Sequence, residues 1–352
     1  MSSSTSSSNR VAAPWRRFFA TAAGTAAAVV AVLFLFAALV DPFDCLPLSP
    51  RLDRPPIAGN ARFAFPALAR SDKFDSALFG TSTSRLIRPV ALNPLFGARF
   101  ANLSMNDATA YEQARLMAIF AEAHPRARVV MVGLDVRWCV TGDTYERLTP
   151  RPFPAWLYES NPWRGYAELL NAHAIQTAGQ MFGVLIGIKP EPYGRDGYTR
   201  FVPPDEEYDR ARAATHLRTA GPNIPGGARD GAPSSWRFPT HELLLEQLGR
   251  FSEATTKILF FVPYHHALLP VPDSDGEAVW RECKRRIVML ADKIPGTVVV
   301  DFMLPSPVTN DDDNYWDPLH YRVAVADTLA RDLAAAVAGR SGPNYRVLHS
   351  GR

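Results

Sequence analysis

The hydrophobic positions of this chain form one long uninterrupted run and, after it, several short runs. Residues 18–40 contain no charged side chain. At 1.5 Å per residue, a helix over this segment is about 34 Å long, which is enough to cross a hydrocarbon core of about 30 Å. The pattern therefore predicts a transmembrane helix over residues 18–40.

Beyond residue 70, short apolar runs alternate with segments of helical spacing. The apolar runs predict five strands, at 74–79, 98–104, 128–136, 257–263 and 297–302. Between and after them, helical spacing is found at 108–124, 241–251, 276–293 and 323–338. Alternating strands and helices predict an α/β fold with a mainly parallel sheet, and five strands suit a three-layer flavodoxin-like sandwich.

Changes of composition predict the organisation of the chain. A segment rich in Pro, Arg and Asp, residues 41–70, is interpreted as a juxtamembrane linker. One domain is expected over 71–340, with an irregular insertion at about 140–240 that holds one helix near 163–185. Residues 1–17 and 341–352 are expected to be tails.

The charges beside the long apolar run predict its orientation. Arg10, Arg16 and Arg17 precede the run, and no acidic residue accompanies them. Positive charge marks the cytoplasmic side, so we expect a single-pass inner-membrane protein with a cytoplasmic N-terminus and an exported main domain. A cleaved signal peptide is the alternative. The run is long for one, and no small-x-small cleavage site follows it, so we favour an uncleaved anchor.

Net charge and cysteine spacing argue against nucleic-acid binding and against a zinc site. The formal net charge is only +3, and no run of Lys and Arg is interleaved with aromatic residues, so no nucleic acid is expected as a partner. Cys45, Cys139 and Cys283 form neither a CxxC pair nor a Cys/His spacing suited to zinc. One disulfide is possible in an oxidising compartment. We favour buried, inert thiols for Cys139 and Cys283.

Two short segments about 235 residues apart carry candidate chemistry. Gly80-Thr81-Ser82 follows the first strand, and Asp317-Pro318-Leu319-His320 precedes the last helix. Both positions fall at the carboxyl edge of the predicted sheet, where functional loops gather. Ser82, His320 and Asp317 supply a nucleophile, a base and an acid that orients the base, as acyl transfer through serine requires. The alternative is a turn and helix-cap cluster with a surface histidine.

These motifs resemble those of the SGNH/GDSL hydrolase superfamily, and most closely the membrane-anchored periplasmic members related to alginate O-acetylation and D-alanyl transfer. The resemblance covers roughly residues 72–136 and 240–340. It implies that Ser82 is the nucleophile, His320 the general base and Asp317 the residue that orients His320.

The resemblance also implies an oxyanion hole, at which this chain departs from the family pattern. The family has a Gly after the second strand and an Asn after a Gly following the third. Here the corresponding segments read Asn102-Leu103-Ser104-Met105-Asn106-Asp107 and Gly133-Leu134-Asp135. We expect the Ser82 amide and Asn106 to be the donors; a turn residue is the alternative for Asn106.

Other residues at the same edge are candidates for substrate binding. Arg85 could hold an anionic group or pair with an acid, and Tyr264 and His265 follow the fourth strand. Asp311, Asp312 and Asp313 are interpreted as a solvated loop, so no metal is expected, and no cofactor.

The predicted function is acyl-ester hydrolysis or O-acyl transfer on an acylated cell-envelope or exported polysaccharide. A multi-pass membrane protein that delivers the acyl group would be the partner of a transferase. A non-catalytic glycan-binding or assembly protein of the same fold and a membrane-tethered lipase or esterase are the alternatives.

Overall fold

The structure is a computed structural model, and it describes residues 8–351. The first seven residues of the predicted tail 1–17 therefore lie outside the described part. The chain divides into two compact units. We call the unit that contains the described residues up to Ile57 and Glu159–Glu191 the helical unit. The sheet unit contains Ala58–Tyr158 and the residues from Pro192 onward.

The helical unit is built on one long helix, α1 (Ser8–Val40). Its segment Pro14–Val40 has a mean hydropathy of 2.5 and is long and apolar enough to be a membrane span or a signal sequence. This confirms a long apolar helix where residues 18–40 predicted one. The helix expected near 163–185 is present as α6 (Arg164–Ala167) and α7 (Ala172–Leu185), and α7 packs against α1.

Six strands form one sheet within the described part of the sheet unit. Their order is β2-β1-β3-β4-β5-β6, and every neighbouring pair is parallel except β5 and β6. The strands are β1 (Ser76–Phe79), β2 (Phe100–Asn102), β3 (Val129–Leu134), β4 (Thr256–Phe261), β5 (Thr297–Asp301) and β6 (Arg346–His349). All residues of β1, β2, β3 and β5 are buried, as parallel strands covered on both faces require.

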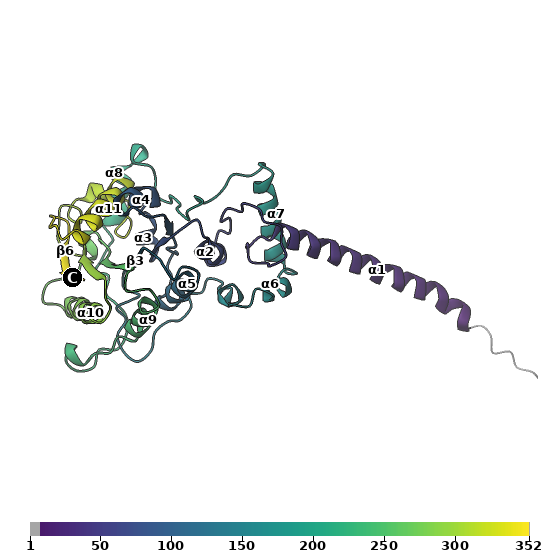
Figure 1. Cartoon of the computed structure of the whole chain (residues 1–352), viewed down its shortest axis with the longest axis horizontal. Helices are drawn as coiled ribbons and strands as arrows, with labels where there is room; N and C mark the ends of the chain where they lie inside the picture. The colour runs from purple at the N-terminus through teal and green to yellow at the C-terminus, as the bar shows by residue number, and fades with distance from the viewer. Residues whose placement is uncertain (1–7, 352) are drawn as a thin grey trace, which may run out of the picture. The chain divides into compact units, whose positions relative to one another are not determined.

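Helices of the sheet unit pack in two groups (Figure 1). Helix α4 contacts α11, whereas α5 contacts α2 and α9, and α9 contacts α10. The longer helices are α2 (Ala61–Arg70), α4 (Pro89–Phe96), α5 (Ala110–Ala123), α8 (Arg210–Leu217), α9 (Pro239–Leu248), α10 (Asp275–Ala291) and α11 (Val323–Val337). Shorter helical turns are α3 (Ser82–Arg85), η1 (Ala155–Tyr158), η2 (Asp205–Glu207), η3 (Pro233–Ser235), η4 (His266–Leu268) and η5 (Asp312–Asn314).

The prediction of five strands was wrong by one. The sixth, β6, lies in the predicted tail 341–352 and pairs antiparallel with β5. Its residues alternate poorly in hydrophobicity, so the sequence gives no strand signal there. Its backbone instead supplies hydrogen-bond partners for β5, which would otherwise be an open edge. The linker also differs, since α2 occupies Ala61–Arg70 and residues from Ala58 onward belong to the sheet unit.

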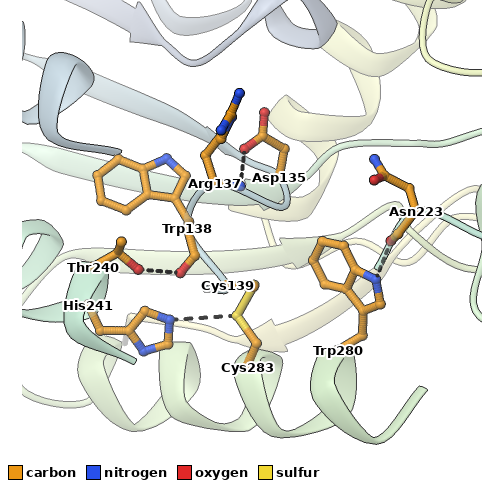
Figure 2. The surroundings of a disulfide bond; sticks show 9 residues. All are labelled: Asp135, Arg137, Trp138, Cys139, Asn223, Thr240, His241, Trp280 and Cys283. Carbon is orange, nitrogen blue, oxygen red and sulfur yellow. Dashed lines mark hydrogen bonds between the residues drawn. A yellow bond between two sulfur atoms is a disulfide. The ribbon is translucent and has the colours of Figure 1, made fainter. Parts of the chain in front are cut away.

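The expectation of free thiols at Cys139 and Cys283 was wrong, because the structure joins them in a disulfide (Figure 2). The two cysteines are 144 residues apart, and spacing of that size carries no information on proximity. Cys139 follows β3 by five residues and Cys283 lies in α10, so the bond fixes the segment after β3 to that helix. Cys45 is not part of a disulfide among the described residues.

Candidate active site

Three loops meet at the carboxyl ends of the parallel strands. The loop after β1 carries Ser82, the loop after β2 carries Asn106, and the loop before α11 carries His320. The backbone N–H of Met105 donates to the carbonyl oxygen of Gly80 (3.0 Å), which joins the first two loops. The fold thus brings residues from distant parts of the sequence to one edge of the sheet.

Ser82 is the first residue of α3 and lies two residues beyond Gly80, which directly follows β1. A side chain at Gly80 would collide with Ser84 Oγ, so only glycine allows the chain to turn so tightly here. The side-chain amide of Asn102 donates to the carbonyl oxygens of Arg85 (3.0 Å) and Ile87 (2.8 Å) and so fixes the far end of α3. No other described residue accepts a hydrogen bond from the backbone N–H of Ser82.

Ser82, His320 and Asp317 form a chain of hydrogen bonds. Ser82 Oγ lies 2.8 Å from His320 Nε2, and His320 Nδ1 lies 2.7 Å from Asp317 Oδ2. When Nδ1 carries the proton and donates to Asp317, Nε2 is free to accept the Ser82 proton. The structure therefore brings the three predicted residues together in a geometry that can activate a serine nucleophile.

The carboxylate of Asp317 is held in its charged form. Burial opposes ionisation, but the hydrogen bond from His320 and the electrostatic attraction between the two groups lower the pKa of Asp317 below its ordinary value of 3.8. The backbone N–H groups of Leu319 (2.9 Å) and His320 (3.0 Å) also donate to Asp317 Oδ1. One carboxylate oxygen is thus reserved for the loop backbone and the other for the imidazole, which fixes the ring orientation.

Two further residues position this group, and sequence reasoning missed both. The hydroxyl of Tyr321 donates to the carbonyl oxygen of Thr83, which ties the histidine loop to α3. The ring of Phe201 meets His320 edge to face at 5.1 Å between centroids. Tyr321 could have been suspected because it follows His320 directly. Phe201 lies in the irregular insertion, where no pattern singled it out.

Arg85 and Asn106 are joined by a hydrogen bond between their side chains. Arg85 is buried, at 4% exposure, and its Nη1 donates to Asn106 Oδ1 (2.7 Å). Its guanidinium also lies over the ring of Tyr193, at 5.2 Å from the centroid. Because Asn106 Oδ1 accepts from Arg85, the amide nitrogen of Asn106 remains as the donor end. Arg85 therefore orients Asn106, and its exposed surface is too small for it to be a main contact for substrate.

Asp135 occupies the position after β3 and contacts the turn that carries Ser82 through Thr81. Thr81 Oγ1 donates to Asp135 Oδ2 (2.5 Å), and the backbone N–H of Arg137 donates to Asp135 Oδ1 (2.9 Å). Burial raises the pKa of Asp135 above its ordinary value, despite these two hydrogen bonds. This carboxyl group therefore supports the residue beside Ser82 and is harder to ionise than Asp317.

Tyr264 and His265, the other predicted substrate contacts, are each 1% exposed. The ring of Tyr264 packs on Trp280, with 6.3 Å between centroids. The imidazole of His265 turns toward Asp312, and its backbone N–H donates to the carbonyl oxygen of Pro318 (3.1 Å). His265 therefore supports the loop between Asp317 and His320, and neither side chain offers much surface to a ligand.

The cluster of His265, His266 and Asp312 has the ligand types and spacing that could hold a metal ion. However, the backbone N–H of Ala267 donates to His265 Nδ1 (3.2 Å), and burial lowers the pKa of His265, which favours its neutral form. The proton then sits on Nε2, which lies 3.0 Å from Asp312 Oδ1. A metal at Nε2 would have to displace that proton and exchange the ring tautomer, so the cluster fits a hydrogen-bonded support better than a metal centre.

Comparisons with known proteins add no assignment. A scan against protein-family models finds no match for the chain, and a search of curated proteins finds none either.

Proposed function

We propose that this chain is a membrane-anchored, exported serine enzyme of the SGNH type that hydrolyses or transfers an acyl ester. The observation that carries the proposal is the hydrogen-bonded chain from Ser82 Oγ through His320 to Asp317. Ser82 lies at the start of a helical turn, with His320 as its base and Asp317 fixing the base. This arrangement is the one that acyl transfer through serine uses on unrelated folds.

The chemistry follows from the donors and acceptors. Ser82 Oγ attacks the acyl carbonyl carbon while its proton passes to His320 Nε2, and Asp317 stabilises the imidazolium that forms. The free N–H of Ser82 and the side-chain amide of Asn106, oriented by Arg85, donate to the oxyanion. His320 then returns the proton to the leaving hydroxyl. Water or an acceptor sugar hydroxyl, activated by His320, releases the acyl group from Ser82.

The three-layer fold and the membrane location are also part of this proposal. The order β2-β1-β3-β4-β5 is that of flavodoxin-like sheets and supports the three-layer arrangement. The arginines before α1 support an inner-membrane anchor with the sheet unit exported, and the Cys139–Cys283 disulfide suits an oxidising compartment. An acylated envelope or exported polysaccharide as substrate, with a membrane protein as acyl donor, rests on the resemblance alone.

The test is labelling of the full chain in detergent by a fluorophosphonate probe, together with hydrolysis of p-nitrophenyl acetate. Ser82→Ala and His320→Ala are expected to lower the rate of hydrolysis by about a thousandfold or more, and Ser82→Ala to abolish labelling. Ser84→Ala is the matched control, because its hydroxyl is buried two residues away and has no hydrogen-bond partner. It is expected to keep both activities.

Absence of labelling in the wild-type chain would overturn the enzyme proposal. So would labelling that is indifferent to Ser82. The observation that favours a non-catalytic role is the carboxyl group of Asp135, which stands where the resembling family has an oxyanion-binding Asn. Its charge would disfavour an oxyanion, and the chain would be better described as a glycan-binding or assembly protein of the same fold.

A further inference from the structure

The part of the irregular insertion that belongs to the helical unit is unusually apolar. Residues 169–188 contain no Asp, Glu, Lys or Arg. Helix α7 occupies most of this run and is 14 residues long, or about 21 Å. That is too short to cross a hydrocarbon core of about 30 Å, and apolar helices of this length are typically buried in a core or lie at a membrane interface.

Burial separates these two possibilities. One face of α7 packs into a small core with the end of α1, through Ala178 and Met181 against Ala37 and Val40. The residues of α7 that are exposed within the described structure are Ala172, His173, Gln176, Gly179 and Phe182, and the exposed Ile186 follows the helix directly. A helix that faces water normally carries charged residues on its exposed side, and the exposed residues of α7 include no Asp, Glu, Lys or Arg.

The exposed apolar surface extends beyond the helix. Phe182 is 44% exposed, Ile186 50% and Ile188 75%, and Leu170 and Trp163 are 49% and 57% exposed. Large apolar side chains gathered at this density on one short segment indicate a surface that meets another apolar phase. Continuity with α1 identifies that phase, since α6 and α7 lie beside the Val40 end of the candidate membrane span (Figure 1).

A contact between aromatic rings shows at which point along α1 the helix α7 packs. Phe182 packs on Phe36 with 5.8 Å between centroids, and Phe36 lies four residues, or about 6 Å, before the end of the span at Val40. Interfacial helices bury their apolar face about 5–10 Å into the boundary between headgroups and acyl chains. Trp163 and Tyr166, which stack at 5.9 Å, are residue types enriched at that boundary.

We propose that residues 163–188, with α7 at their centre, form a second membrane contact that lies in the lipid–water interface beside the span formed by α1. The proposal rests on α1 spanning a membrane, and it does not depend on the acyl-transfer chemistry. The sheet unit would then be joined to a membrane-bound unit at three points of the chain, after Ile57, after Tyr158 and before Pro192. A single flexible linker would leave it far freer to reorient.

The test is depth-dependent fluorescence quenching on the full chain, reconstituted in vesicles of phosphatidylcholine and phosphatidylglycerol. In a Cys45→Ser background with the disulfide kept oxidised, Ile186→Cys carries an environment-sensitive dye. Lipids with a spin label near the headgroup or deep in the acyl chain act as quenchers. We expect shallow quenchers to act more strongly than deep ones at position 186, and the same result for Ile188→Cys.

Two matched positions make each outcome decisive. Val29→Cys in α1 should be quenched mostly by the deep label, and Val90→Cys, an exposed apolar position in the sheet unit, by neither. Position 186 behaving like position 90 while position 29 is quenched would overturn the interfacial helix alone. No quenching at position 29 would overturn the anchor as well. A blue-shifted dye at 186 that lipids do not quench would mean that a second protein copy covers this surface.

Discussion

Two segments contact the Ser82 turn, and they are built in different ways. The segment after β3 reaches Thr81 through Asp135, which is 4% exposed, and it is held to α10 by the Cys139–Cys283 disulfide (Figure 2). The loop before α11 reaches Ser82 through His320, and the side chains of His320 and Asp317 are 19% and 29% exposed. Within the described residues, hydrogen bonds hold this loop, and no disulfide does.

The difference explains why two carboxyl groups near one serine have opposite pKa shifts. Asp135 is buried against a neutral hydroxyl, so its charged form is penalised. Asp317 is less buried and faces an imidazole and two backbone N–H groups, so its charged form is favoured. A carboxylate that must stay charged to stabilise an imidazolium belongs in the second setting, and a carboxyl group that supports a turn can occupy the first.

Asp317→Asn is expected to have the largest effect on the reactivity of Ser82. The Asn amide would donate to His320 Nδ1 and leave the imidazole proton on Nε2, where it blocks transfer from Ser82. We expect the rate of ester hydrolysis to fall by about 10⁴-fold while the fold is retained. The rates of p-nitrophenyl acetate hydrolysis and of fluorophosphonate labelling check the loss of reactivity, and circular dichroism checks that the fold is retained.

Asp311→Asn is the matched control for that substitution. Asp311 lies six residues earlier in the same loop, is exposed, and caps η5 by accepting from the N–H of Asp313. Asn caps a helical turn equally well, so labelling should be unchanged. Equal losses in the two variants would mean that the loop, and not the tautomer of His320, had been disturbed.

The second-largest effect is expected on the stability of the sheet unit, through the disulfide that holds the segment after β3 to α10. Reduction of the bond, or Cys139→Ala combined with Cys283→Ala, is expected to lower the free energy of unfolding of the sheet unit by about 2–4 kcal/mol. Urea unfolding of the full chain in detergent, with and without dithiothreitol, measures it. The rate of Ser82 labelling in the absence of urea should change little, because His320 and Asp317 lie on the other segment.

Addition of dithiothreitol to the double variant should have no further effect on unfolding. A destabilisation of wild type and double variant by the same amount would show that the reductant acts elsewhere, and would contradict the role given to the Cys139–Cys283 bond.

Much of this arrangement could be predicted from the sequence, since local pattern and strand topology determine it. Ser82 and the Asp317–His320 pair follow or precede elements with clear periodicity, and parallel strands place such loops at one edge of the sheet. The α/β class and the long apolar helix were predicted correctly for the same reason. The roles of the three residues in catalysis remain predictions.

What the sequence did not reveal depends on contacts between distant segments without a local pattern. The Cys139–Cys283 bond, the hydrogen bond from Tyr321 to Thr83 and the contact of Phe201 with His320 are of this kind. Arg85 was expected to meet an anion or an acid, yet it donates to the amide oxygen of Asn106. Strand β6 was missed because pairing with β5, and not hydrophobic alternation, determines it.

Asp135→Asn is expected to have the smallest effect on the reactivity of Ser82, and it tests the role of the segment after β3 directly. Asn keeps an acceptor for Thr81 Oγ1 and removes a charge that would repel an oxyanion, so the labelling rate near neutral pH should stay within about tenfold of wild type, and should not fall.

In wild type, the folded pKa of Asp135 lies above its ordinary value of 3.8. The free energy of unfolding of wild type therefore falls as pH rises from about 3.8 through that folded pKa. This fall should be absent in Asp135→Asn.

The same titration of unfolding free energy should give the opposite slope for the other carboxyl group. The folded pKa of Asp317 lies below 3.8, so its contribution is present above that value and is lost as pH falls through the folded pKa. Relative to wild type, Asp135→Asn should thus gain stability as pH rises, and Asp317→Asn should lose it. Parallel curves for the two variants would contradict the assignment of one buried supporting carboxyl and one charged orienting carboxylate, because only that difference in environment separates their titrations.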